Sequence, residues 1–184
     1  MACLLTAGRL NPCNDTQGGL AFVEFADFDT LGLATFESGS DAIASFAGTP
    51  VWYKYELNSN ANNFVENINS DADAGTTFYE QVLTLSLKKL DSVSHKELKL
   101  VTYGRPHVRI TDRNGNVFIM GLLEGAKVTG GSAVTGGAMG DLYGYSITFT
   151  GMEKLPAAFL TGSTTTSALA GLTQNFTVVN GTNN

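Results

Sequence analysis

Alternation of apolar and polar residues over two long segments, 76–88 and 143–150, constrains the fold more than any other feature of the sequence. A period of two is typical of a strand with one face on a core and the other face in solvent. Gly151 is expected to break the second strand, and Pro156 prevents it from continuing as a central strand. The residues expected to face the core are Leu83, Leu85, Leu87, Tyr145, Ile147 and Phe149.

Composition supports a fold dominated by strands and turns. The chain has 184 residues, with 21 Gly, 11 Phe and 6 Tyr but only 4 Pro. Aromatic residues favour strands and glycine favours turns, and this length buries a substantial core without disulfides. The prediction is a mainly β protein, a β-sandwich or barrel with one flanking α-helix. Its expected parts are an N-terminal arm (1–18), one domain (19–160) and a polar C-terminal extension (161–184).

Several further elements are predicted from shorter patterns. In the first strand, Phe22 and Glu24 share one face while Val23 and Phe25 share the other, so both faces are expected to be partly covered. A short helix is expected at 41–46. The remaining predicted strands are 20–28, 33–36, 51–57 and a short one within 64–68.

The segment 90–105 is predicted to be the flanking helix. Ser94 and Glu97 have the spacing of a capping box, and Gly104 is expected to end the helix. The leucines of this segment also alternate, so a strand stays open as a competing interpretation.

Turn and glycine signals organise the second half of the chain. A hairpin is predicted over 107–123, because an Asn-Gly pair lies in the turn 112–116 between two apolar runs. Val-Thr-Gly-Gly occurs at 128–131 and again at 134–137, which indicates flexible or edge-strand backbone. The apolar segment 176–179 is expected to add a strand to the sheet or to a neighbouring subunit.

Residues with catalytic or metal-binding chemistry are few and poorly placed. Asp71 and Asp73 are not followed by the series of oxygen ligands, ending in a bidentate Glu, that a calcium loop needs, and they are interpreted as turn residues. His95 and His107 are the only histidines, and no G-x-S-x-G elbow accompanies them. The glycines of 130–140 lack the Lys-Ser/Thr of a phosphate-binding loop. No catalytic, cofactor or metal site is therefore expected.

Charge and cysteine content exclude further classes. The formal net charge is −6, which disfavours tight binding of nucleic acid. No apolar run reaches the ~20 residues of a membrane helix, so no membrane partner is expected. Cys3 and Cys13 are interpreted as free thiols, with a short-range disulfide as the alternative. A loose basic cluster is expected to form a solvated face or to pair with a neighbouring subunit; its members are Lys88, Lys89, Lys96, Lys99, Arg105 and Arg109.

The region from about residue 75 to 160 resembles a known family. Its sequence includes GTTFYEQVLTLSLKKLD, HKELKLVTYGRPHVRITDRNGNVFIMGL and GDLYGYSITFTGMEKLPAAFL. This pattern resembles the tail tube proteins of tailed bacteriophages, including those of Bacteroidetes phages. The resemblance implies a β-sandwich with one helix, six copies of which form a ring with a continuous inner β-barrel.

Further expectations follow from that resemblance. The chain would be a structural virion protein of the tail, made in the host cytoplasm, without enzymatic activity or cofactor. Its partners would be copies of itself, other tail proteins, and DNA that passes through the lumen without specific binding. The alternative is a β-sandwich binding module, such as a capsid decoration or adhesion protein. The residues that would face the lumen are Thr84, Ser86, Ser146, Thr148 and Thr150.

Overall fold

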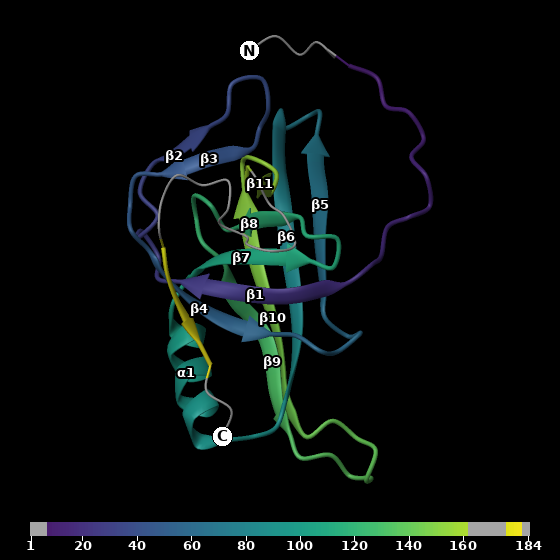
Figure 1. Cartoon of the computed structure of the whole chain (residues 1–184), viewed down its shortest axis with the longest axis vertical. Coiled ribbons are helices and arrows are strands. Elements are labelled where there is room, and N and C mark those ends of the chain that lie inside the picture. The colour runs from purple at the N-terminus through teal and green to yellow at the C-terminus, as the bar shows by residue number, and fades with distance from the viewer. Residues whose placement is uncertain (1–6, 162–175, 182–184) are drawn as a thin grey trace.

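Two β-sheets pack face to face in the computed structural model, which describes residues 7–161 and 176–181. The strands of one sheet run along the long axis of the molecule and those of the other run across it (Figure 1). The six-stranded sheet has the order β11 (Ala158–Phe159), β8 (Val117–Met120), β7 (His107–Asp112), β1 (Leu20–Ala26), β4 (Val51–Glu56), β12 (Thr177–Asn180). The four-stranded sheet has the order β5 (Asn63–Asp71), β6 (Thr76–Lys88), β10 (Gly144–Glu153), β9 (Lys127–Val134).

The main core lies between these two sheets. Val23 and Phe25 of β1 meet Leu83 of β6 and Phe149 of β10, and the rings of Phe25 and Phe149 lie 5.2 Å apart. Burying each large apolar side chain contributes roughly 1.5–3 kcal/mol. The mainly β fold with a single helix, predicted from the alternation, is confirmed for the described residues.

A second core covers the opposite face of the six-stranded sheet. The hairpin of β2 (Ala34–Phe36) and β3 (Ile43–Phe46) lies over this face and buries Ile43 and Phe46 against Trp52 and Ile119. Both faces of β1 are therefore covered, as its imperfect alternation predicted. The predicted helix at 41–46 is wrong, because these apolar residues are held in register with β2.

The helix α1 (Ser92–Tyr103) packs against one end of the main core through Leu98. This resolves the choice between helix and strand in favour of the helix. Its N-cap is Asp91, whose carboxylate accepts the backbone N–H groups of Val93 and Ser94. The predicted capping box that begins at Ser94 is wrong, since the aspartate already satisfies the first free N–H groups.

Two strands of the four-stranded sheet extend further than predicted. β10 continues through Gly151 to Glu153, because every residue up to Glu153 has a partner on β6. The prediction that Gly151 ends the strand is wrong. β5 is also longer than the short strand expected within 64–68, since each of its residues has a partner on β6.

Turns and chain ends follow the predictions closely. The β7–β8 hairpin forms around Asp112–Asn116, where Gly115 adopts a φ of 84°. Asp112 accepts hydrogen bonds from the backbone of Asn114 and Asn116. The segment 7–18 is an exposed arm outside the two sheets (Figure 1). β12 pairs in parallel with β4 and so adds the predicted C-terminal strand to the six-stranded sheet.

Candidate functional site

The outer face of the four-stranded sheet is the candidate functional surface. On β6 and β10, Leu83 and Phe149 point into the core, so the residues between the core residues point outward. The register places Ser86 opposite Ser146 and Thr84 opposite Thr148. All of the residues predicted to line a lumen therefore share this one face, and each is half-buried by its neighbours on the sheet. Their role in a lumen stays a prediction.

Strands at both sides extend this polar face. On β9, the Thr129 hydroxyl lies 2.9 Å from the Thr150 hydroxyl, and Ser132 is opposite Ser146. On β5, Asn63 is opposite Thr84. The sequence interpretation missed these flanking residues, because the glycine and asparagine of β9 and β5 weaken the alternation that identified β6 and β10.

Both edges of this sheet are open within the described residues. β5 pairs with β6 alone and β9 with β10 alone, so each leaves one row of backbone N–H and C=O groups without a strand partner. The prediction of an edge strand in the glycine-rich segment is confirmed. A Cβ at Gly131 would lie 3.0 Å from the Ser146 carbonyl oxygen, so glycine permits the close approach of β9 to β10.

A polar cluster joins the two sheets near the end of β10. Glu153 accepts the backbone N–H groups of Leu123 and Glu124 through Oε1, at 2.9 and 2.8 Å. Burial raises the pKa of Glu153, although these two hydrogen bonds act in the opposite direction. The arrangement anchors the turn after β8 and keeps the Glu153 carboxylate buried.

The two histidines lie on different elements. His107 of β7 is buried, with Nδ1 2.6 Å from the Gly121 carbonyl oxygen and Nε2 accepting the Asp29 N–H at 3.1 Å. These partners fix the neutral tautomer that carries its proton on Nδ1. Desolvation lowers the pKa of His107. His95 lies on the exposed side of α1, 6.0 Å from the Tyr145 ring.

The aspartates of the β5–β6 turn have structural partners. Asp71 Oδ1 accepts the N–H groups of Asp73 and Ala74 at 2.9 and 3.0 Å, the geometry of a turn. In the described part of the chain, no group of three or more His, Cys, Asp or Glu residues could hold a metal ion.

The loose basic cluster is not a single surface. Arg109 is only 1% exposed and pairs through Nε with Glu24 on the same face of the six-stranded sheet. Its guanidinium also lies 4.7 Å from the centroid of the Trp52 ring. The prediction that Arg109 belongs to a solvated face is therefore wrong. Val108 and Ile110 of β7 point into the main core, so Arg109 between them points to the opposite face, where the second core covers it.

A recess of about 520 Å³ lies where the N-terminal arm enters the six-stranded sheet. Its walls include Gln17, Asn60 and Asn63, together with the charged residues Asp112 and Arg113. The rings of Phe64 and Phe118, 5.0 Å apart, form an apolar side. The recess combines hydrogen-bonding groups with aromatic surface, as small-molecule sites commonly do.

Further observations complete the comparison with the sequence. Cys13 is exposed and unpaired, and Cys3 lies outside the described residues. Among the described helices, none has the length and hydropathy needed to span a membrane. Comparison with protein-family models, with curated proteins and with solved structures gives no match.

Proposed function

We propose that this chain is a structural subunit of a phage tail, which assembles into homohexameric rings that stack into a tube for DNA. The observation that supports this proposal best is the construction of the four-stranded sheet. It combines an outer face whose centre carries threonine and serine hydroxyls with an open edge on each side. Open edges of this kind are templates for pairing with another chain.

Strand direction makes the two edges compatible with each other. All neighbours in the order β5-β6-β10-β9 are antiparallel, so the two edge strands run in opposite directions. Copies related by rotation about an axis along the strands keep those directions. The β9 strand of one copy would therefore meet the β5 strand of the next in an antiparallel pair. Repetition of this contact closes a barrel and removes the edges.

The outer face would then form the wall of the barrel. At its centre, the hydroxyls of Thr84, Ser86 and Thr148 offer hydrogen bonds without positive charge. Affinity for DNA comes mainly from Lys and Arg at the phosphates. Among the described residues of this face, the register adds Lys88 at the end of β6 and Lys127 opposite Thr150, so a duplex that moved past would meet few cations.

Electron microscopy of the purified protein in negative stain tests the proposal. We expect rings or tubes from the wild type. Ile68→Lys is expected to prevent ring formation while the subunit stays folded, because it places a charge on the β5 edge, where Ile68 is 69% exposed. Leu100→Lys, at a site on α1 that is 57% exposed, is the matched control and should form rings.

A binding module of the virion is the second candidate, and the recess beside Phe64 and Phe118 favours it. Amide groups and an aromatic surface together suit a hydroxyl-rich ligand such as a glycan. A chain that stays monomeric under all conditions and binds a glycan or receptor saturably would overturn the tail tube proposal in favour of this one.

A further inference from the structure

His107 connects two loops that are far apart in the sequence, the turn after β1 and the turn after β8. Its Nδ1 donates to the Gly121 carbonyl oxygen at 2.6 Å, and its Nε2 accepts the Asp29 N–H at 3.1 Å. The ring is also stacked on that of Phe28, with the two centroids 5.1 Å apart. His107 is buried, so these neighbours enclose it.

The two loops differ in how they are held. In the turn after β8, the Gly121 N–H donates to Gln81 Oε1, and Glu153 accepts two further backbone N–H groups. In the turn after β1, Asp29 has a φ of 66°, a left-handed conformation that is unfavourable for a residue with a Cβ. The turn after β8 is therefore fixed independently of His107, whereas the turn after β1 would relax if it were released.

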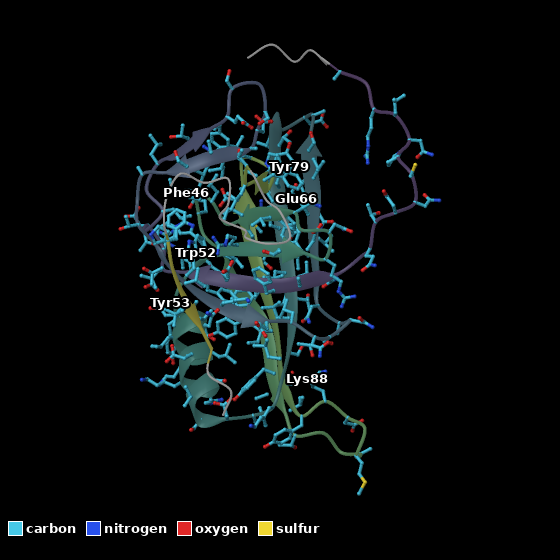
Figure 2. All side chains as sticks on the ribbon, viewed as in Figure 1. Phe46, Trp52, Tyr53, Glu66, Tyr79 and Lys88 are labelled. Carbon is cyan, nitrogen blue, oxygen red and sulfur yellow. The ribbon has the colours of Figure 1, made fainter. Side chains whose placement is uncertain are left out.

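The turn after β1 is connected to the second core. Leu31 lies two residues beyond Asp29 and is buried there, and its carbonyl oxygen accepts the N–H of Gly48, just after β3, at 2.8 Å. Phe46 of β3 and Trp52 of β4 belong to the same core and lie close together in Figure 2. A shift of Asp29 is therefore expected to displace Leu31 and the end of β3 from Trp52.

We propose that His107 is an acid-sensitive latch, and that its protonation releases one end of the β2–β3 hairpin from the second core. In the imidazolium, Nδ1–H keeps its bond to Gly121, whereas Nε2 becomes a donor that faces the Asp29 N–H. Two donors cannot bond, so the contact with the turn after β1 is the one that breaks. The hairpin then pivots about Ile43, whose carbonyl oxygen accepts the Thr161 N–H at 2.9 Å, because neither of these backbone atoms titrates.

The surroundings of the ring set the pH at which the latch opens. Burial lowers the pKa of His107, and the hydrogen bond to Gly121 acts in the opposite direction. The Asp29 carboxylate raises this pKa and the Arg105 guanidinium lowers it. The latch is therefore closed at neutral pH and opens as the pH falls through the lowered pKa of His107.

The other charged groups near the ring have partners. Arg105 pairs with Glu124 at 3.9 Å, and Arg109, two residues along β7, pairs with the buried Glu24. Burial raises the pKa of Glu153, so protonation of this carboxylate favours the folded state. Acid is therefore not expected to loosen the turn after β8 through Glu153.

Fluorescence of Trp52 provides the first test, because it is the single tryptophan of the chain and is 0% exposed. From pH 7.5 to 5, we expect its emission to shift reversibly to longer wavelength. The acrylamide quenching constant should rise about twofold or more, as expected for local opening. The far-UV circular dichroism spectrum should change little, since the two large sheets stay paired. Fluorescence that is constant over this range would overturn the latch.

Substitution of the two histidines identifies the titrating group. His107→Gln should abolish the pH dependence of the fluorescence, because the amide does not titrate in this range. His95→Gln changes the exposed histidine of α1 and should keep the wild-type transition. A wild-type transition in His107→Gln would overturn the assignment.

Asp29→Gly tests the other side of the latch without changing the histidine. Glycine keeps the N–H that binds Nε2, adopts a positive φ without strain, and removes the carboxylate that favours the imidazolium. The transition should therefore move to lower pH by roughly half a unit or more. Asp27→Asn, at an exposed residue of the same turn, is the matched control and should titrate as the wild type does. An unchanged or higher midpoint in Asp29→Gly would contradict the latch.

Hydrogen exchange distinguishes local release from global unfolding. At pH 5, after correction for intrinsic rates, amides of 29–33 and 43–48 should lose protection by about tenfold or more while those of β6 and β10 keep theirs. Equal loss in all of these segments would overturn the latch in favour of global unfolding. The outcome does not depend on whether the chain forms rings.

Discussion

The side chain of Gln81 on β6 joins the two sheets, because its Oε1 accepts the backbone N–H of Gly121, just after β8, at 2.9 Å. Its Nε2 donates to Glu66 on β5 at 3.1 Å, and Glu66 in turn accepts the N–H of Ala157 at 2.7 Å. Gln81 is 1% exposed. A single buried amide therefore links three segments: β5 through Glu66, the turn after β8 through Gly121 and, by way of Glu66, the segment after β10 at Ala157.

Gln81→Leu is expected to destabilise the fold by about 1–3 kcal/mol, since it leaves the buried Gly121 N–H without an acceptor. The free energy of unfolding in urea measures this. Thr84→Val, on the outer face of the same strand, is the matched control and should change stability by less than about 0.5 kcal/mol. Equal effects of the two substitutions would show that Gln81 does not join the sheets in solution.

Much of the fold was predictable from the sequence because alternation reports local backbone geometry directly. The strand 76–88 has the predicted bounds, and the outward residues of β6 and β10 are the ones expected. The predictions failed where pairing with a neighbouring strand outweighs the preference of the local sequence. Gly151 stays in β10 because β6 continues beside it, and residues 43–46 form a strand because β2 pairs with them.

The polar interior was not predictable by the same reasoning. The partners of Arg109 and His107 come from β1 and from the turn after it, far away in the sequence. Alternation on β7 places both side chains on one face, but it does not show that a second layer covers that face. The open edges of the sheet were anticipated only through the glycine content of β9.

Breaking the Glu24–Arg109 pair is expected to be costly. Arg109→Met leaves the Glu24 carboxylate buried without its cation, with a loss of about 3–5 kcal/mol. Glu24→Leu/Arg109→Met removes both charges and should recover much of that loss. Chemical denaturation of both single variants and the double variant gives the coupling energy. A coupling near zero, like the value of ~0–1 kcal/mol expected for the exposed Lys54–Glu56 pair, would contradict a buried ion pair.

Acid is expected to weaken the fold through His107. Burial lowers the pKa of this residue below 6.5, so the unfolded chain binds the proton more tightly than the folded protein does. The stabilisation is fully present above about pH 6.5 and is lost as the pH falls through the lowered pKa. Asp29 and Arg105 are the charged neighbours, and their effects on the pKa oppose each other. The urea midpoint, measured from pH 7.5 to 5, follows this loss.

His107→Gln should flatten that pH dependence, although the variant starts from lower stability. His95→Gln changes the exposed histidine of α1 and should leave the dependence as in the wild type. Glu153 acts with the opposite sign, because its raised pKa makes its contribution more favourable as the pH falls. The quantity to compare is therefore the slope of the urea midpoint against pH in each variant. Identical slopes for His107→Gln and His95→Gln would contradict the assignment of the acid sensitivity to His107.

Adjacent residues of β10 provide a test of which face is buried. Phe149 is 0% exposed in the main core, whereas Thr148 is on the outer face of the same strand. Phe149→Asp is expected to prevent folding, because it places an unpaired carboxylate in an apolar interior. Thr148→Asp should leave the circular dichroism spectrum unchanged and shift the urea midpoint only slightly. If Phe149→Asp folded and assembled like the wild type, the face assigned to the core would be wrong, and with it the polar wall proposed for the lumen.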